Sequence, residues 1–336
     1  MATLKSLQFT SARLCVVGNI NRDLKTAPFQ GGAFLLGDGE TSVRAIQETI
    51  GGGGANSAAI AAGLGGRVSF VGQVGNDALG RTLERALRRS GVRCHLHRHA
   101  RAATGSTINL VFESGHRHFL SCHPNNAALA FPHLDLSPLA RADHLLRADI
   151  WFSEPMLYGG NEKLFRLARR KGVPISLDLN WDPCWGRVGR AEIKRRKTAV
   201  RRLLPAVALA HGNVRELNEF TESTDLATSL RRLTTWGVAA VVVHLGSDGA
   251  GYYRGGEWTV EKPCFVKHPR LATGTGDVLS ACLMLLHQRA DLSIRDKLRL
   301  ANRTVARFME GKLKLIPELS DPTLRRRGGA DEWIGG

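Results

Sequence analysis

The stretch GGGGANSAAIAAGLGG, residues 51–66, places four consecutive glycines directly before an alanine-rich run. Alanine has the highest helix propensity, so the run predicts a helix that begins in a glycine turn. Glycine has no side chain, and its backbone can therefore come very close to whatever lies against it. The stretch ATGTGDVLSACLMLLH, residues 272–287, repeats this order of a glycine turn and an apolar helix. Because N–H groups at a helix start can bind an anion, both turns are candidate binding sites.

Outside these two stretches, short β-branched runs alternate with helical patterns. For example, the apolar run 68–75 precedes the amphipathic segment 77–91. This alternation predicts an α/β fold of three layers, α/β/α, with a mainly parallel central sheet and helices on both faces. Further strands are expected at 148–155 and 264–269.

Two segments interrupt the alternation. Residues 19–50 show no helical pattern until 41–50, and residues 93–125 read as short strands of alternating polarity. Both are expected to form a small β-sheet lid that projects from the main body. One α/β domain is expected over 11–316, followed by a turn-rich, charged tail at 317–336 that lies loose or docks peripherally.

The composition is that of an ordinary globular protein, with 43% apolar and 23% charged residues among 336. No apolar run approaches the roughly 20 residues that cross a bilayer, and the N-terminus lacks the apolar core of a signal peptide. We therefore expect no membrane partner and a cytoplasmic location. Six scattered cysteines form no C-x-x-C pair, and CHLHRHA at 94–100 is interpreted as a strand rather than as a metal site.

The net charge of +17 raises the question of nucleic-acid binding. Positive charge is densest at 187–204, a segment without the interleaved aromatic side chains that stack on bases. We interpret this segment as a helix with a basic, solvated face. Specific nucleic-acid binding is not expected, although a positive field attracts phosphorylated metabolites.

Neither a P-loop nor a dinucleotide-binding glycine motif occurs. Four other features occur in order: GNINRD at 18–23, GGGGAN at 51–56, GNVRE at 212–216 and TGTGD at 273–277. Together they resemble the ribokinase-like (PfkB-type) family of carbohydrate and nucleoside kinases, over about residues 14–311. The resemblance implies a sugar substrate, ATP and Mg²⁺, and it also implies a lid over the substrate.

The same resemblance implies the residues of a sugar pocket. Asp23 matches a carboxylate that accepts hydrogen bonds from sugar hydroxyls, a pairing that suits its two acceptor oxygens. Glu154 matches an acid at the end of a strand. The expected substrate-binding residues are Asp23, Gly52, Gly53, Asn56, Glu154, Asp178 and Asn180. Gly53 stands where ribokinase itself has lysine.

On the nucleotide side, the resemblance makes Asp277 the base that accepts the proton of the attacking hydroxyl. Gly274, Thr275 and Gly276 would present N–H groups to the transferred phosphoryl group. Asn213 and Glu216 match the residues that organise Mg²⁺ through water. The remaining expected nucleotide-binding residues are His244, Gly246, Gly249, Thr273 and Asn302.

Three departures from the family pattern bear on function. His244 replaces a threonine that often contacts nucleotide, which places one side-chain contact in doubt. Leu271 replaces an aspartate found in members activated by a monovalent cation, so weak or no potassium activation is expected. Asp182 replaces an arginine in the segment SLDLNWDPCWG, and a carboxylate there would repel an acidic sugar. This replacement favours a neutral sugar.

Several alternatives stay open. A nucleoside kinase would use an aromatic slot, for which Phe29, Phe34 and Phe119 are candidates. A phosphosugar kinase would need a phosphate clamp, which Arg22, His116, Arg117 and His118 could form. A catalytically silent ligand-binding or nucleic-acid-binding protein on this fold is a further alternative. Trp181 and Trp185 could stack on a sugar or fill the core, and a homodimer through the lid is plausible.

Overall fold

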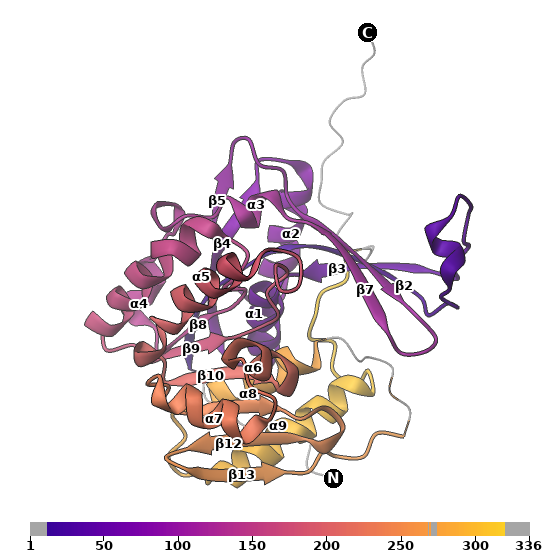
Figure 1. Ribbon diagram of the computed structural model, residues 1–336. Coiled ribbons are helices and arrows are strands. Elements are labelled where there is room, and N and C mark those ends of the chain that lie inside the picture. The colour runs from indigo at the N-terminus through magenta and orange to yellow at the C-terminus, as the bar shows by residue number, and fades with distance from the viewer. Residues whose placement is uncertain (1–11, 268, 270–273, 320–336) are drawn as a thin grey trace.

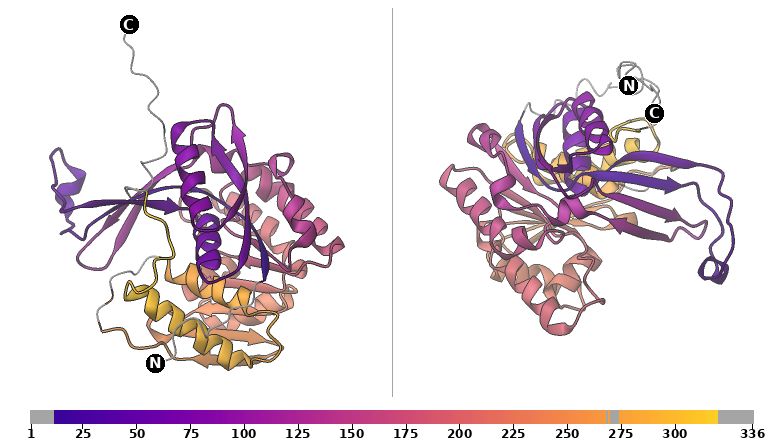
Figure 2. Two further views of the ribbon diagram at one scale, coloured as in Figure 1. Left: turned by 180° about the vertical axis from the view of Figure 1, so that it is seen from behind. Right: turned by 90° about the horizontal axis from the view of Figure 1, so that it is seen from above.

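The computed structural model describes residues 12–267, 269 and 274–319, and it forms three layers (Figures 1 and 2). Within the described residues the central layer is a nine-stranded sheet. All strands from β11 to β5 in the sheet order are parallel, and β12 and β13 form an antiparallel edge. In sheet order the strands are β13 (Glu257–Glu261), β12 (Ala250–Arg254), β11 (Val241–His244), β10 (Leu209–Asn213), β9 (Ile175–Asp178), β8 (His144–Arg147), β1 (Arg13–Val17), β4 (Arg67–Gly75) and β5 (Arg93–His99).

Helices cover both faces of this sheet because successive strand side chains point to opposite sides. Leu14 and Val16 of β1 belong to one buried apolar cluster, whereas Cys15 and Val17 belong to another. The first cluster is covered by α1 (Gly53–Gly63), α2 (Ala78–Arg89), α8 (Thr275–Leu285) and α9 (Ile294–Met309). The second is covered by α4 (Asn161–Arg170), α5 (Arg190–Arg201), α6 (Val214–Thr221) and α7 (Leu226–Thr235). The expected three-layer α/β/α fold is confirmed.

A second, four-stranded sheet forms the lid, which projects from the main body in Figure 1. Its order is β3 (Ile46–Gly51), β2 (Asn21–Thr26), β6 (Ser106–Val111) and β7 (Arg117–Cys122), and the short helix α3 (Pro124–Ala127) follows it. Asp23 pairs with Thr107 and Leu24 pairs with Ile108. The lid therefore has one face that carries Asp23 and an opposite face that carries apolar side chains.

Four local expectations were wrong. Residues 46–51, which overlap the expected helix 41–50, form strand β3 because they pair with β2 along its whole length. Residues 93–99 form β5 at the edge of the main sheet, so the lid's second segment begins later than expected. The strand expected at 148–155 lies at 144–147, and no strand forms in the described residues 262–267.

The C-terminal segment packs against the lid where it is described. Ile50 donates a backbone hydrogen bond to Pro317, and Leu319 donates one to Glu48. Residues 320–336 lie outside the described residues. Among the helices that the structure describes, none is long and apolar enough to cross a membrane.

Candidate active site

Five carboxylates gather where the parallel strands end. Asp149 follows β8, Asp178 ends β9, Glu216 lies in the first turn of α6, Asp277 lies in the first turn of α8, and Asp23 comes from lid strand β2. Burial is the main cause that raises the pKa of Asp178 and of Asp277, and repulsion from the neighbouring carboxylates adds to it. Segments far apart in the sequence therefore form one acidic site.

Asp149 holds the first glycine turn in place. Its carboxylate accepts backbone hydrogen bonds from Asn19 at 2.9 Å, Gly53 at 3.1 Å and Gly54 at 2.8 Å. The next amide, of Ala55, donates to the Asn19 carbonyl. The N–H groups at the start of α1 are thus bonded within the chain, and a carboxylate in this position also interacts favourably with the helix dipole. The family motifs did not predict a role for Asp149. Its position as an acid directly after an apolar strand could have indicated one.

The four glycines are bare because the chain itself lies against them. A Cβ on Gly51 would stand 2.1 Å from the Asp23 carboxylate. Gly52 has φ +91°, and a Cβ there would stand 2.5 Å from the Asn19 carbonyl oxygen. Side chains at either position would push Asp23 or the turn out of place.

The second glycine turn precedes α8. Gly274 begins α8 with φ +88° and has no side chain to cap the helix. Asp277 lies in the first turn, where the Asn56 amide hydrogen bonds to its carboxylate. Burial, and then the charge of Asp149, raise the pKa of Asp277 to about 8. The two turns therefore meet across one site, with Asp277 at their junction.

His244, at the end of β11, lies under this second turn. Its Nε2 is 3.2 Å from the Ser280 hydroxyl, and a Cβ on Gly276 would stand 3.0 Å from its Nδ1. Burial lowers the pKa of His244 to about 4, so the ring is neutral at physiological pH. His244 supports the backbone of α8 from below.

Comparison with known proteins agrees with this arrangement. A model of the pfkB family of carbohydrate kinases matches residues 11–309. The chain belongs to this family. An uncharacterized sugar kinase of Archaeoglobus fulgidus is 25% identical over 248 residues, which cover 74% of this chain and 93% of that protein. The protein is thus an ATP-dependent carbohydrate kinase, as expected.

Solved structures share its fold. Arabidopsis thaliana ribokinase complexed with ribose and ATP superposes with a TM-score of 0.70 at 22% identity, covering 94% of this chain and 99% of that one. Vibrio cholerae fructokinase in its fructose, ADP and calcium ion bound form gives 0.72 at 21% identity, covering 94% and 98%. At this level of identity, the likeness shows the fold alone.

In this pfkB kinase, neighbouring side chains hold Asp23 in place. Asn21 donates to the carboxylate at 2.7 Å, and Thr107 also hydrogen bonds to it. Burial raises the pKa of Asp23 to about 6, against the effect of these hydrogen bonds. Asn180 links two other acids, because its amide donates to Asp178 at 3.0 Å and its oxygen accepts from the Asp149 backbone at 3.1 Å.

Asn213 and Glu216 form a capping box at the start of α6. Each side chain accepts the other's backbone N–H, at 2.9 Å and 2.8 Å. The Trp181 backbone also donates to Glu216. This role explains both residues locally, and their part in holding Mg²⁺ stays a prediction. Carboxylate and amide oxygens of Asp178, Glu216 and Asn213 are the donor type that Mg²⁺ prefers.

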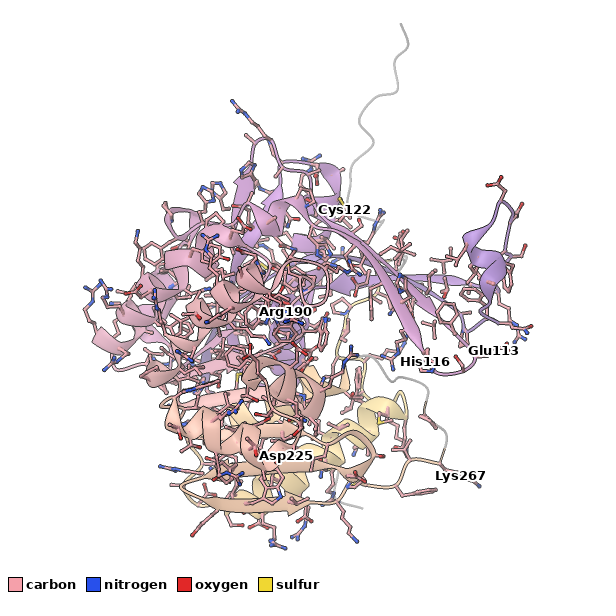
Figure 3. The ribbon with its side chains drawn as sticks, viewed as in Figure 1. Glu113, His116, Cys122, Arg190, Asp225 and Lys267 are labelled. Atoms are coloured by element: carbon pink, nitrogen blue, oxygen red, sulfur yellow. The ribbon has the colours of Figure 1, made fainter. Side chains whose placement is uncertain are left out.

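Two acids do not lie where the sequence placed them. Glu154 is exposed beyond the end of β8, whereas Asp149 occupies the strand end. Asp182 is fully buried, and Arg196 of α5 pairs with it at 2.7 Å and 3.1 Å. Asp182 therefore cannot repel a substrate, and the argument drawn from it for a neutral sugar was wrong. Helix α5, whose first residue Arg190 is labelled in Figure 3, is rich in basic residues. One of them, Arg196, pairs with a buried carboxylate inside the protein and does not face solvent.

Some residues of the alternative hypotheses contact other parts of the chain. Arg22 lies on the lid face opposite Asp23, and its Nε donates to Ser106. His116 lies near Glu113 at the far end of the lid in Figure 3. Phe29 packs against Phe112, with 5.3 Å between ring centroids. Trp185 is buried against Trp151 and fills the core, whereas Arg215 stacks on Trp181.

The expected nucleotide-binding residues are only partly described. Gly246 has φ +62° and faces open space, whereas a Cβ on Gly249 would stand 2.2 Å from the Glu261 carbonyl oxygen. Both donors of the Asn302 amide bind the carbonyls of Glu261 and Lys262, and they hold the end of β13. Thr273 and Leu271 lie outside the described residues. The expectation of weak or no potassium activation, which depends on Leu271, therefore stays a prediction.

Proposed function

We propose that this kinase transfers the γ-phosphoryl group of ATP to a hydroxyl of a neutral sugar, with Asp277 as the base. The observation that carries the proposal is the packing of α1 against α8, which places Asn56 beside Asp277. It brings the turn next to Asp23 against the first turn of α8. A sugar hydroxyl bound near Asp23 would lie within reach of Asp277, and phosphoryl oxygens would lie at the N–H groups of α8.

Each part of the site then has one task. Asp277 accepts the hydroxyl proton as the oxygen attacks phosphorus, and its raised pKa lets it hold that proton. The first-turn amides of α8 hydrogen bond to the oxygens of the transferred group, where charge develops. Mg²⁺-bound ATP supplies the phosphoryl group, with the metal neutralising part of its charge.

The charge of the pocket supports a neutral substrate on grounds independent of Asp182. Burial is the main cause that raises the pKa of Asp23 and of Asp277, and the charge of nearby Asp149 raises both further. A phosphate or carboxylate on the sugar would add a further negative charge to this cluster. Hydroxyl groups instead donate hydrogen bonds to carboxylates, which lowers the cost of their burial.

A substrate panel tests the proposal directly. ADP release by the full chain would be measured with neutral sugars, nucleosides and sugar phosphates at equal concentration. We expect a neutral sugar to give the highest kcat/KM. A sugar phosphate or a nucleoside that exceeds every neutral sugar would contradict the substrate class.

Asp23→Ala is expected to raise the KM for the sugar by about 10–100-fold, because hydrogen bonds to a charged acceptor are lost. The KM for ATP should change little, since Asp23 comes from the lid. Asp38→Ala, an exposed acid between β2 and β3, serves as the matched control. A change confined to the ATP constant would show that the sugar pocket lies elsewhere.

We expect kcat/KM to rise with pH and to level off near pH 8. The base must be ionised, so activity falls about tenfold per pH unit below the pKa of Asp277, which burial raises to about 8. Glu216→Gln keeps the capping box but removes one charge that raises this pKa. In the Glu216→Gln variant, the fall of kcat/KM on the acid side of the pH profile should therefore occur at lower pH. An unchanged pH profile would count against an effect of the Glu216 charge on the pKa of Asp277.

We further infer that two copies of the chain pair through their lids. Ile46, Ile108 and Leu120 are 59%, 41% and 51% exposed on the lid face opposite Asp23. A second lid would cover these apolar side chains. Light scattering should give a dimer for the native chain and a monomer for Leu120→Lys. A native chain that is monomeric at micromolar concentration would refute the inference.

A further inference from the structure

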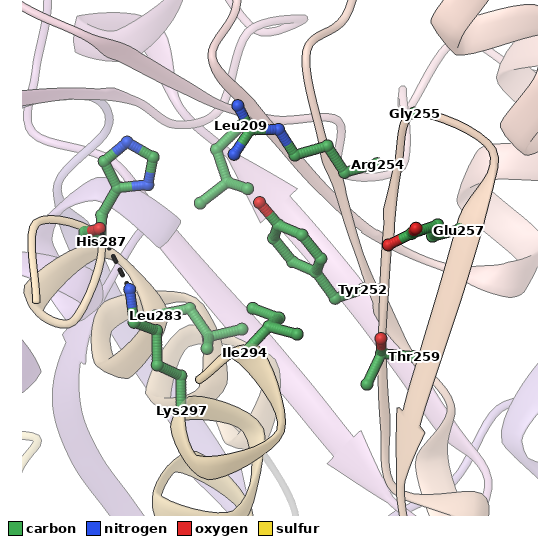
Figure 4. A pocket seen from close by; sticks show the side chains of 10 residues that line it. All are labelled: Leu209, Tyr252, Arg254, Gly255, Glu257, Thr259, Leu283, His287, Ile294 and Lys297. Atoms are coloured by element: carbon green, nitrogen blue, oxygen red, sulfur yellow. Dashed lines mark hydrogen bonds between the residues drawn. The ribbon is translucent and has the colours of Figure 1, made fainter. Parts of the chain in front are cut away.

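A cavity of about 470 Å³ lies at the end of α8 remote from Asp277 (Figure 4). The strand pair β12–β13 supplies Tyr252, Arg254 and Glu257, and the segment after α8 supplies His287. Lys297 of α9 closes the remaining side. At 1.5 Å per residue, about 12 Å of helix separates Asp277 from Leu285, two residues before His287. The cavity is therefore distinct from the phosphoryl-transfer site.

Positive charge in this cavity lacks carboxylate partners. In the described part of the chain, neither Arg254 nor Lys297 forms an ion pair, and Lys297 instead donates to the His287 carbonyl at 3.2 Å. Arg299, two residues farther along α9, pairs with Glu261 at 3.1 Å. Burial lowers the pKa of Lys297 and of His287, and for His287 the charges of Lys297 and Arg254 lower it further. Arg254 also hydrogen bonds to the Tyr252 hydroxyl. Both cations therefore bind neutral groups rather than a carboxylate, and their charge is available to an external anion.

The polar wall of the cavity continues into the core. The His287 ring stands edge-on to His144, with 5.0 Å between centroids. His144 is 2% exposed, and its Nε2 is 2.7 Å from the Ser176 hydroxyl, but its Nδ1 has no hydrogen-bond partner among the described residues. A buried polar atom without a partner indicates a bound water or ligand that completes the network.

We propose that this cavity binds a small phosphorylated molecule, with a phosphoryl group between Arg254 and Lys297. A guanidinium fork and an ammonium group together suit the tetrahedral oxygens of a phosphate. The volume lies within the range of about 300–1,000 Å³ typical of metabolite sites. Tyr252 and Thr259 supply hydroxyl groups for the rest of the molecule.

The site is placed to act on the catalytic helix. Leu283 of α8 lines the cavity, and Lys297 binds the carbonyl that follows the helix. A phosphate that draws Lys297 toward itself would compete with this carbonyl for the ammonium protons. An effect on turnover rests on the proposed kinase function, whereas binding does not.

Binding of inorganic phosphate to the full chain tests the proposal, with the ring resonances of His287 as the local probe. Phosphate should raise the pKa of His287 by screening the two cations. Arg254→Gln and Lys297→Gln should each weaken binding about tenfold or more, since each removes a charge-assisted hydrogen bond. Glu257→Gln should tighten binding severalfold, because it removes a carboxylate from the lining.

Two controls separate this site from the active site. Arg299→Gln, on the same helix but outside the cavity, should bind phosphate as the native chain does. Asp277→Asn should also bind normally, so the result stands or falls independently of catalysis. The proposal would be overturned if the native chain showed no saturable binding of phosphate. It would also be overturned if Arg254→Gln, Lys297→Gln and Glu257→Gln chains that melt normally bound phosphate with the native affinity.

Discussion

Replacing Asp277 by asparagine is expected to lower turnover by about 10²–10⁴-fold, which is the usual worth of a positioned general base. Asparagine keeps the shape of the side chain and its contact with Asn56 but cannot accept the proton. The free energy of unfolding of this variant should rise, although its turnover falls. Burial raises the pKa of Asp277 from 3.8 to about 8, so ionising this group destabilises the folded state as pH rises through that window. A neutral amide removes this cost.

The measurements are sugar-dependent ADP release and thermal unfolding at pH 7 and above. Asp38→Asn, an exposed acid between β2 and β3, should leave both quantities unchanged. A variant that loses turnover and also melts at a lower temperature would indicate a structural role for Asp277. Turnover at the native level would refute its role as the base.

Asp149→Ala is expected to lower the free energy of unfolding by about 2–4 kcal/mol. The change leaves two buried backbone N–H groups, of Asn19 and Gly54, and the partly buried N–H of Gly53 without their acceptor. It also places alanine at φ 56°, a conformation that asparagine tolerates far better. Asp149→Asn should therefore cost less, since its one remaining oxygen can still cap α1. Urea unfolding at neutral pH measures the difference.

Glu154→Ala is the matched control, because Glu154 is an exposed acid five residues farther along the chain. We expect its effect to stay within about 0.5 kcal/mol, as for other surface substitutions. The opposite outcome is that Glu154→Ala lowers stability and sugar affinity more than Asp149→Ala does. That result would restore Glu154 as the acid at the substrate and would refute the capping role of Asp149.

Much of the fold was predictable because it depends on local patterns. Strand β11 was expected from the uninterrupted β-branched run 241–243, which is typical of parallel strands buried on both faces. The helices α2 and α8 were expected from their periodicity and from the glycine turn before α8. Strand β3 was not, because its pairing with β2 overrides the helical pattern of residues 41–50.

The roles of individual acids were less predictable. From the sequence, Asp182 was expected to face the substrate. In the structure its charge is neutralised by Arg196, which lies 14 residues away on α5. Glu154 matched the motif, but the chain turns after Arg147, so Asp149 lies at the strand end. In both cases the sequence shows a carboxylate but not the partners that decide what it does.

By itself, the sequence determined the layered α/β fold, the family and the two glycine turns, because propensity, periodicity and ordered motifs are written along the chain. Only the tertiary structure decided which acid caps the first glycine turn, and which carboxylates share a site. The reason is that a charged group acts according to the donors and charges around it. For Asp149, one of those donors is 130 residues away in sequence and 2.9 Å away in space.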